Sequence, residues 1–564
     1  MAARVFPLER VERERSMLMN TAQVLVKCLE SEGVKYIFGI PGEENLEIIE
    51  ALRDSPIQFI TVRHEQGAAF MADMYGRLTG RAGVCLGTLG PGATNLITGV
   101  ADANMDGAPL VCITGQVGTE RMHITSHQYL DLVTLFEPVT KRSRQIVRAD
   151  TVNEIIRNAF KHAQQEKPGA SHVDLPCNIA RMEVEEGPSS HPIHPYEPNA
   201  ELADVTSIRA AADLIAGAER AVVLAGHGAV RGHASEALTH FADTLHIPVI
   251  NTMMAKGIIP CDDDYECGTI GIPQKDYPDA LIEHADLVIA VGYDLVEYAP
   301  TKWNPKADHK ILHIDAHTAQ VNKLYQPNAS VVGDIPHSLE KLITFCQPKT
   351  VADDMFALRD EMRHEREMYA DDDGCPVKPQ KVLCDIRKVL GKSDILISDV
   401  GAHKMWIARQ YPCYRPNTCI ISNGFATMGL SVPGAIAAKL VYPDKKVMAV
   451  TGDGGFLMNC QELETAARLK TPFVTLIFHD GSYGLIKWKQ MERYHHATSV
   501  DFTNPDFVQL AESFHCIGYR IEKAEDLLPT LEKAFAQDVP VIIDCPVDYG
   551  ENMKLTAHLS ERFQ

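Results

Sequence analysis

The amino-acid sequence predicts an α/β protein made of three domains with mostly parallel sheets. Short runs of Val, Ile and Leu alternate with longer amphipathic segments, of which Gln461–Lys470 is an example. This alternation is typical of strand–helix units on parallel sheets. The chain has 564 residues, which exceeds what one hydrophobic core supports, so three domains of ordinary size account for it better than two.

Two stretches rich in proline and charged residues divide the chain into these domains. The first runs from Glu186 to Pro198 and the second from Gln347 to Pro379. Both are predicted to be loops, because proline and dense charge disfavour the interior of a helix or strand. The predicted organisation is an N-terminal extension at 1–17, three Rossmann-like α/β domains at 18–186, 199–346 and 379–546, and a tail at 547–564.

The composition excludes several classes of function. The net charge of −21 disfavours a broad nucleic-acid interface, because phosphate backbones would be repelled, although it leaves a small anionic substrate open. No apolar stretch reaches the roughly 18 residues of a membrane span, and the N-terminus lacks a signal-peptide core. The 14 cysteines include no C-x-x-C pair, so neither a zinc ribbon nor a disulfide framework is indicated. We therefore expect a cytoplasmic protein that binds neither membranes nor nucleic acid.

Two acidic residues follow neighbouring apolar runs in the C-terminal third. Val447–Val450 precedes the segment Gly452–Gly455, which contains Asp453, and Phe473–Phe478 precedes Asp480. The carboxyl ends of parallel strands meet at one edge of a sheet, so both carboxylates are expected to lie together. The glycines allow backbone N–H groups to approach phosphate oxygens, and Mg²⁺ commonly joins carboxylates to a ligand phosphate. The sequence thus predicts a magnesium diphosphate site, although the glycine motif taken alone favours a plain strand-to-helix turn.

The middle of the chain contains a segment that superficially suggests a dinucleotide site. Ala221–Ala225 is followed by Gly226 and Gly228, but no third glycine arrives at the fingerprint spacing. A strand-to-helix turn is the favoured interpretation. The central domain is predicted to be structural, or to hold a ligand unrelated to the chemistry.

A set of further motifs resembles the thiamine diphosphate enzymes. Within that family the chain resembles the acetolactate synthases, especially the FAD-independent catabolic kind, from about Ala22 to Asn552. The motifs that carry the resemblance are Gly39–Gly42, Arg63–Glu65, Gly90–Leu96, His127–Gln128, Gly292–Tyr298, Ser422–Gly424, Thr427–Gly429, Gly452–Gly455 and Pro546–Tyr549.

The resemblance implies a pyrimidine-binding domain, a central domain and a diphosphate-binding domain, with thiamine diphosphate and Mg²⁺ as cofactors. It also implies a homodimer or a dimer of dimers, in which the cofactor lies between the N-terminal domain of one subunit and the C-terminal domain of another. The implied reaction is the condensation of two pyruvates, which are small 2-oxo acids, to 2-acetolactate with loss of CO₂.

Residues of the N-terminal domain take specific roles by this resemblance. Glu65 matches the acid that hydrogen-bonds N1′ of the pyrimidine, a bond that a buried carboxyl group holds without competition from water. Gln128 matches an active-site glutamine near the reacting carbon, and His127 is the residue found before it in the catabolic kind. The remaining implied cofactor contacts are Pro41, Gly42, Pro91 and Asn95.

Residues of the C-terminal domain complete the implied site. The metal would be bound by Asp453, Asp480 and the backbone carbonyl of Ser482. Met428 matches the methionine that bends the cofactor, where a flexible thioether suits an irregular gap, and the Ala426 carbonyl would accept from the 4′-amino group. The implied contacts to the diphosphate and its surroundings are Gly401, Ala402, His403, Gly452, Gly454, Gly455, Tyr483 and Gly484.

Several alternatives stay open at this stage. Tyr293–Glu297 departs from the segment that lies near FAD in the anabolic relatives, whereas Gln116 looks more like the FAD-dependent branch. The chain is therefore expected to lack flavin, with an FAD-containing acetohydroxyacid synthase catalytic subunit as an alternative. Another thiamine diphosphate-dependent decarboxylase or carboligase, and a non-catalytic nucleotide-binding module, are further alternatives. Neither the acceptor preference nor the presence of a regulatory subunit follows from the sequence, and the tail is a candidate cover for the site.

Overall fold

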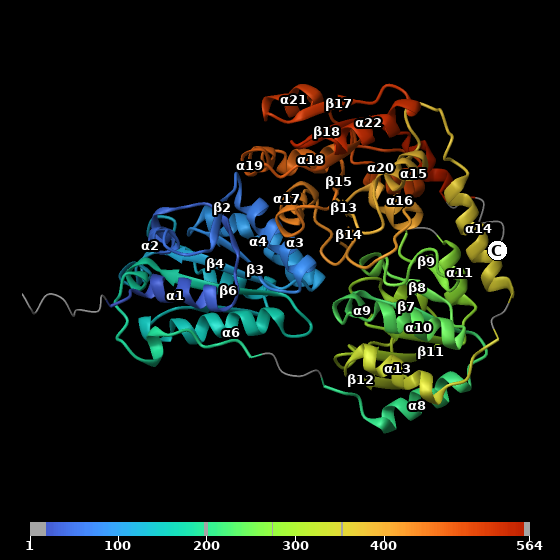
Figure 1. Ribbon diagram of the computed structural model, residues 1–564, viewed down its shortest axis with the longest axis horizontal. Helices are drawn as coiled ribbons and strands as arrows, with labels where there is room; N and C mark the ends of the chain where they lie inside the picture. Colours follow the sequence, from blue (N-terminus) through green and yellow to red (C-terminus); the bar gives the residue numbers. More distant parts are fainter. Residues whose placement is uncertain (1–17, 197–200, 273–274, 351–352, 556, 558–564) are drawn as a thin grey trace, which may run out of the picture.

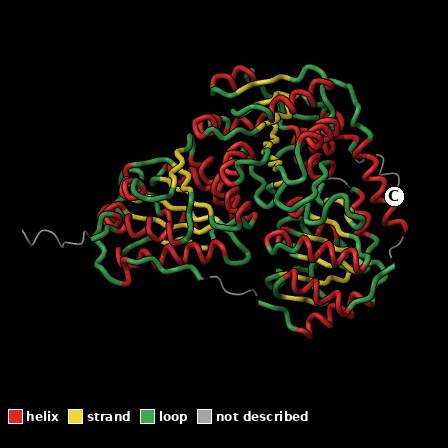
Figure 2. The backbone as a smooth tube through the Cα atoms, viewed as in Figure 1, coloured by secondary structure: helices red, strands yellow, loops and turns green. Residues whose placement is uncertain are grey.

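The computed structural model describes residues 18–196, 201–272, 275–350, 353–555 and 557 (Figure 1). The predicted N-terminal extension lies outside the described residues. The described chain forms three α/β domains, each built on a six-stranded parallel sheet. This arrangement confirms the predicted fold class. Figure 2 shows helices beside the strands of every domain.

The N-terminal sheet has the strand order β2-β1-β3-β4-β6-β5. Its strands are almost entirely buried from β3 to β6, except in the short edge strand β5. The strands are β1 Tyr36–Gly39, β2 Gln58–Thr61, β3 Gly83–Gly87, β4 Leu110–Gln116, β5 Arg142–Gln145 and β6 Ala170–Pro176, and the main helices are α1 Thr21–Ser31, α2 Leu46–Leu52, α3 Glu65–Thr79, α4 Pro91–Asp106, α5 Leu132–Phe136 and α6 Val152–Gln164.

The C-terminal sheet repeats this topology, with the order β14-β13-β15-β16-β18-β17. The apolar runs that end before Asp453 and Asp480 form the adjacent strands β15 and β16, as predicted. The strands are β13 Ile395–Ser398, β14 Cys419–Ile421, β15 Val447–Gly452, β16 Val474–His479, β17 Ile517–Arg520 and β18 Val541–Pro546, and the helices are α15 Pro379–Val389, α16 Ala402–Gln410, α17 Ser431–Val441, α18 Asp453–Asn459, α19 Glu462–Leu469, α20 Gly484–Tyr494, α21 Phe507–Ser513 and α22 Leu527–Phe535.

The central sheet has the different order β12-β11-β10-β7-β8-β9. This is the order of dinucleotide-binding folds, whose ligands bind where the strand order reverses, here between β7 and β10. The strands are β7 Ala221–Ala225, β8 Val249–Asn251, β9 Glu266–Thr269, β10 Leu287–Val291, β11 Lys310–Asp315 and β12 Ala329–Val332, and the helices are α8 Val205–Ala216, α9 His227–Arg231, α10 Ser235–Leu245, α11 Tyr277–Glu283, α12 Pro300–Trp303 and α13 Ile335–Phe345.

The N-terminal and C-terminal domains share a continuous hydrophobic core. Helix α3 packs against α17, and Phe70 and Met74 of α3 belong to the same buried cluster as Val432 and Ile436 of α17. The two helices lie side by side in Figure 1, while the central domain packs below the C-terminal domain. Burial of this apolar surface between the domains fixes their relative position.

One predicted loop contains a helix. Within the segment from Gln347 to Pro379, residues Asp353–Glu367 form α14, which runs along the edge of the molecule in Figure 1. The prediction was wrong because charge density alone does not prevent a helix when one face is buried. Met362 of α14 is 2% exposed and packs with Tyr277 of the central domain. No helix in the described parts of the chain is long and apolar enough to cross a bilayer.

Candidate active site

Glu65 stands at the first residue of α3, at the end of the segment that follows β2. The His64 side chain caps the helix by accepting a hydrogen bond from the Gln66 N–H at 3.1 Å. The Glu65 residue is 8% exposed, and the Asn95 side chain of α4 donates to its Oε2 at 3.0 Å. The structure therefore places a carboxyl group in a nearly dry setting, with an amide as its neighbour.

Thr88 lies between Gly42 and the start of α4, which approaches Glu65. Thr88 touches the backbone of both Gly42 and Gly92, where an added Cβ atom would lie 2.4 Å and 2.8 Å from its side chain. The same position on Gly92 lies 3.4 Å from Glu65 Oε1. Thr88 is thus a contact residue that sequence reasoning missed, although it lies two residues before the motif Gly90–Leu96.

Pro91 is the first residue of α4, and the loop carrying Gln128 lies beside this helix start. An added Cβ on Gly90 would lie 2.8 Å from the Gln128 Cβ, and Gln128 has a positive φ of 58°. Gln128 and His127 are exposed, as is Pro41 after β1. Six further predicted residues of this domain therefore lie on the loops and helix starts around the carboxyl end of the N-terminal sheet. They are Pro41, Gly42, Pro91, Asn95, His127 and Gln128.

Asp453 and Asp480 follow β15 and β16, and the structure brings them together. The Asp453 Oδ2 accepts from the backbone N–H groups of Asp480 at 3.2 Å and Gly481 at 2.7 Å. Burial, and secondarily Asp453, raises the pKa of Asp480 to about 6. Two carboxyl groups this close disfavour joint ionisation, and a bound cation would relieve that repulsion.

Other predicted residues surround this pair. Ser482 is 4% exposed, its hydroxyl donates to Asp480 Oδ2 at 2.5 Å, and its carbonyl accepts from Gly484 N–H at 2.9 Å. Tyr483 is 42% exposed, and its ring lies against Gly454, where an added Cβ would be 3.0 Å away. Added Cβ atoms on Gly455 and Gly484 would lie 2.9 Å from Asp399 Oδ1 and 3.1 Å from Asp480 Oδ2, so side chains pack closely against these glycines.

His403 stands at the start of α16, beside the predicted diphosphate position. It is 1% exposed, and the ring lies next to both Gly401 and Gly452. Burial lowers the pKa of His403 to about 3, so the imidazole is neutral. Its Nε2 has no hydrogen-bond partner among the described residues, which is unusual for a buried polar atom and fits a ligand oxygen at that position.

Sequence reasoning missed Asn504, which completes the acidic cluster. Its side-chain amide donates to Asp453 Oδ2 at 2.8 Å, while its own Oδ1 is buried without a partner. An unpaired amide oxygen beside two carboxylates suits a hard cation or its water shell. The described residues contain no group of three His, Cys, Asp or Glu side chains that could bind a metal, so a magnesium ion here would need oxygens from a ligand phosphate and water.

Met428 lies on a loop of unusual backbone conformation. Residues 422–429, termed the 422–429 loop, include Ala426 with φ 59° and Gly429 with φ 91°. Asp399 holds the end of this loop. Its fully buried carboxylate accepts from the N–H groups of Gly429 at 2.9 Å and Ser431 at 3.1 Å. A positive φ at an alanine is costly, so the surrounding hydrogen bonds must hold it.

The N-terminal domain supplies part of that support. Asp102 of α4 accepts from the hydroxyls of Ser422 at 3.0 Å and Thr427 at 2.6 Å. Asp106, one helical turn later, accepts from the N–H groups of Gly424 at 2.7 Å and Phe425 at 3.1 Å. Both aspartates also pair with the buried Arg77 of α3. Sequence reasoning missed both residues, since their position within one helix carries no sign of partners more than 300 residues away.

The C-terminal domain in turn supports a segment of the N-terminal domain, through Glu462. This C-terminal-domain residue is fully buried, and its Oε1 accepts from the N–H groups of Arg63 and His64, both at 3.0 Å. An added Cβ at Gly67 would lie 2.7 Å from the same oxygen. Glu462 therefore fixes the start of α3, and with it the position of Glu65.

Within one chain, the Glu65 group and the Asp453 group are separate. The only hydrogen bond to the Glu65 carboxylate among the described residues comes from Asn95 of its own domain, and the partners of Asp453 all lie in the C-terminal domain. The structure thus presents two separate groups of candidate site residues, one in each outer domain, which are termed half-sites.

Comparison with known protein families identifies the family of the chain. Three family models match the chain: the thiamine pyrophosphate enzyme N-terminal TPP binding domain over residues 19–135, the central domain over 208–342, and the C-terminal TPP binding domain over 399–545. The chain belongs to the thiamine pyrophosphate enzyme family. The half-site with Glu65 lies in the first matched region, and the Asp453 half-site lies in the third.

The similar proteins include acetolactate synthases named as catabolic enzymes and others named as large subunits. It is 36% identical to "Acetolactate synthase" of Bacillus subtilis over 97% of this chain and 96% of the relative. It is 37% identical to "Acetolactate synthase, catabolic" of Raoultella terrigena, covering 97% and 99%, respectively. It is also 35% identical to "Probable acetolactate synthase large subunit" of Methanocaldococcus jannaschii, covering 95% and 93%. The chain is therefore a thiamine pyrophosphate-dependent enzyme related to acetolactate synthases.

Proposed function

We propose that this enzyme condenses two molecules of pyruvate to 2-acetolactate and CO₂, without FAD. The observation that carries the proposal is the pair of half-sites, a buried carboxyl at the head of α3 and an acidic, glycine-lined cluster after β15 and β16. The names of the relatives that match nearly the whole chain support the choice of acetolactate as the product.

The C-terminal residues fit a cofactor that carries a diphosphate and a magnesium ion. Asp453, Asp480 and the Ser482 carbonyl would hold the metal, since they offer the oxygen ligands that Mg²⁺ prefers. His403 and the backbone at Gly401 and Gly454 would face the phosphate oxygens, and the orphaned Nε2 of His403 supports this placement.

The N-terminal residues would control the protons. Thiamine diphosphate, when bound, supplies a thiazolium carbon that adds to a 2-oxo acid and accepts the electrons released by decarboxylation. Glu65 would hold a proton at the pyrimidine N1′, because its buried carboxyl faces little competing water. The 422–429 loop would impose the bent cofactor shape through Met428. Gln128 would orient the carbonyl of the second 2-oxo acid.

A complete site then requires two subunits. Among the described residues, the Glu65 carboxylate is hydrogen-bonded within its own domain, and the two domains of one chain meet through a packed core of α3 and α17. We infer that the Glu65 half-site of one subunit faces the Asp453 half-site of another, in a homodimer or a dimer of dimers.

The central domain supports the absence of flavin. At the reversal point of its sheet, the start of α9 is the position where a dinucleotide phosphate would bind. The buried side chain of Glu297 occupies it, accepting from the His227 N–H at 2.9 Å and 3.0 Å. The Thr252 hydroxyl donates to the same carboxylate at 2.5 Å, and an added Cβ on Gly226 would lie 2.8 Å from it. A phosphate would have to displace Glu297.

A product assay tests the proposal. Purified enzyme is incubated with pyruvate, thiamine diphosphate and Mg²⁺, with and without FAD, and acetolactate, acetaldehyde and CO₂ are quantified. The expected result is that acetolactate and CO₂ form in equal amounts, at rates that FAD does not change. Free acetaldehyde without acetolactate would identify a 2-oxo acid decarboxylase instead, and a strict FAD requirement would identify the anabolic type.

A further inference from the structure

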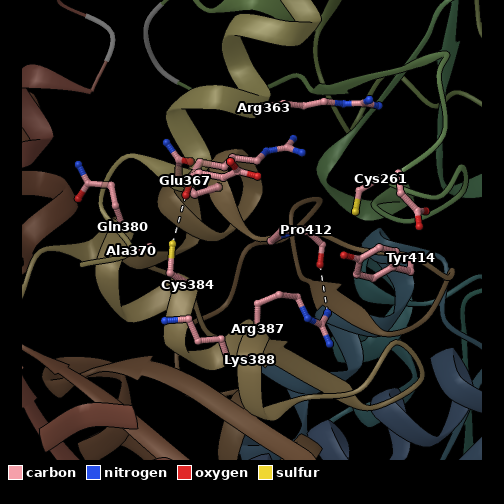
Figure 3. Close-up of a pocket in the computed structure, with 13 residues that line it drawn as sticks. Cys261, Arg363, Glu367, Ala370, Gln380, Cys384, Arg387, Lys388, Pro412 and Tyr414 are labelled. Carbon is pink, nitrogen blue, oxygen red and sulfur yellow. Dashed lines mark hydrogen bonds between the residues drawn. The ribbon is translucent and has the colours of Figure 1, made fainter. Parts of the chain in front are cut away.

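A cavity of about 440 Å³ lies apart from both half-sites, at the junction of the central and C-terminal domains (Figure 3). Its walls come from α14, from α15, from the loop that contains Tyr414, and from the central-domain loop at Cys261. The volume falls within the range of small-molecule sites, which is about 300–1,000 Å³. Nothing in the proposed reaction uses this cavity.

The cavity lining is basic, in contrast to the chain as a whole. Arg363, Arg366, Arg387 and Lys388 line it, together with only two acidic residues, Asp262 and Glu367. Figure 3 shows Arg363 on one side of the space and Arg387 and Lys388 on the other. A concentration of positive charge in a protein with a net charge of −21 requires a specific reason, because the overall field does not favour anions.

Of the three guanidinium groups in the described lining, Arg366 has an ion-pair partner, whereas the hydrogen bonds of Arg363 and Arg387 go to backbone carbonyls. Among the described residues, Arg363 donates to the Asp263 backbone carbonyl, and Arg387 donates to carbonyls that include that of Pro412, at 3.1 Å. Arg366 forms an ion pair with the buried Glu266 at 3.8 Å, a separation too long for a hydrogen bond. Arginine presents five N–H donors, so each group retains capacity for an anionic ligand.

Buried polar atoms in the lining also lack partners. Gln410 is 7% exposed, and its Oε1 has no hydrogen-bond partner among the described residues. The Nε atoms of Arg363 and Arg366 are buried and equally unpaired, and the Arg366 side chain is 9% exposed. Buried polar groups are almost always paired in folded proteins, so this cluster fits a polar occupant of the cavity.

We propose that this cavity binds a small organic phosphate. The guanidinium groups of Arg363, Arg366 and Arg387 would bind the phosphate, since their planar donors match its oxygens. Gln410 and the ring of Tyr414 would contact the organic part. A free phosphate ion would fill only a small part of the volume and would leave the amide unpaired.

A binding experiment with the complete enzyme tests the proposal. Calorimetric titration is performed with enzyme saturated in thiamine diphosphate and Mg²⁺, so that the catalytic phosphate position is blocked. The probes are AMP, ribose 5-phosphate and inorganic phosphate. The expected result is one further site per chain for at least one of the two esters, with an affinity about tenfold or more above that of inorganic phosphate. Saturation should also raise the melting temperature, because the ligand binds only the folded chain.

Variants assign the binding to this cavity. Arg363→Gln and Arg366→Gln should each weaken the ester by about tenfold or more, since each removes a charged donor. Arg359→Gln is the matched control: Arg359 lies one turn earlier on α14, also donates to a backbone carbonyl, that of Asp264, and does not line the cavity. The ester should bind Arg359→Gln as tightly as it binds the unmodified enzyme.

Three results would overturn the proposal. These are the absence of binding by both esters, binding of inorganic phosphate as tight as that of the esters, and unchanged ester affinity in Arg363→Gln. If Arg366→Gln fails to fold, as judged by circular dichroism, the comparison of Arg363→Gln with Arg359→Gln still decides the outcome.

Discussion

At the residue scale, Glu65 illustrates how a single carboxyl group acquires a role from its surroundings. Its residue type is common on helix starts, where it stabilises the helix dipole. Here the first turn of α3 is covered by α4 and by the C-terminal domain, which leaves Glu65 8% exposed. Burial and the Asn95 amide, not the helix position, distinguish this glutamate from ordinary first-turn acids.

The substitution Glu65→Gln tests that role. It preserves size and the hydrogen bond to Asn95 after amide rotation, but it removes the exchangeable carboxyl proton. Turnover should fall by about 10²-fold or more, with the melting temperature nearly unchanged. Steady-state rates with pyruvate and a thermal melt measure both quantities. Undiminished turnover would contradict the proposed N1′ contact.

A second residue-scale prediction concerns Glu297. Burial raises the pKa of Glu297 from 4.5 to about 7. Between these values the folded carboxyl keeps a proton that the unfolded one has lost, so its contribution to stability is complete below pH 4.5 and declines as the pH rises towards 7. Glu297→Gln cannot ionise, and its stability relative to the unmodified enzyme should therefore rise by roughly 1–3 kcal/mol between about pH 5 and 8.

Denaturant unfolding of both proteins at the two pH values measures this difference. Glu283→Gln serves as the control, since Glu283 lies on the exposed surface, where it pairs with Lys275 at 2.9 Å. The control should show no such trend. A stability difference between Glu297→Gln and the unmodified enzyme that stays constant with pH would refute the assignment.

At the scale of elements, the chain uses each outer domain to position the active-site segment of the other. Glu462, the first residue of α19, binds the backbone just before α3, while Asp102 and Asp106 of α4 hold the 422–429 loop. These carboxylates are fully or almost fully buried. Removing a buried acceptor leaves N–H groups unpaired, which costs about 1–3 kcal/mol for each group.

Glu462→Ala should move the start of α3 and lower turnover, because Arg63 and His64 lose the acceptor of their N–H groups. Glu462→Gln keeps one acceptor oxygen and can donate to the Thr465 hydroxyl, so it should retain most of the activity. A decrease of about tenfold or more in kcat for the alanine variant, rescued by glutamine, is the expected pattern. Equal defects in both variants would show that the charge matters instead of the hydrogen bonds.

Asp106→Ala should weaken cofactor binding by distorting the 422–429 loop. The N–H groups of Gly424 and Phe425 lose their acceptor, and the dissociation constant for thiamine diphosphate should rise about tenfold. Asp73→Asn is the control, because Asp73 pairs with the same Arg77 but makes no hydrogen bond to the loop. Fluorescence titration at saturating Mg²⁺ measures both constants, and equal effects of the two substitutions would refute a role through the loop.

At the scale of the whole molecule, two half-sites on one chain predict that activity is a property of the dimer. A subunit with Glu65→Gln and a subunit with Asp453→Ala are each defective in a different half-site. When both chains form one dimer, one of its two sites receives both intact halves. Co-expression should therefore restore about a quarter of the full activity, because half of randomly formed dimers are mixed.

The control for this experiment is co-expression of two chains that carry the same substitution, which should stay inactive. Differently tagged chains allow the mixed dimer to be purified and assayed by itself. A mixed dimer as inactive as either parent would show that each chain builds its site alone, and would overturn the proposed interface.

The sequence by itself determined the three α/β domains and the pairing of Asp453 with Asp480. Both follow from local rules: apolar runs make buried strands, and residues after neighbouring parallel strands meet at one edge. Glu65 at the start of a buried helix was predictable in the same way, with the resemblance to a family giving it a role.

Only the tertiary structure decided which buried polar groups meet. The contacts of Glu462 with Arg63, of Asp106 with Gly424, and of Asn504 with Asp453 join segments that no periodicity connects. The helix α14 and the basic cavity beside it also arise from packing, since a charged segment folds when one face is covered. Local patterns specify elements, whereas the requirement that buried polar atoms find partners is met across the whole fold.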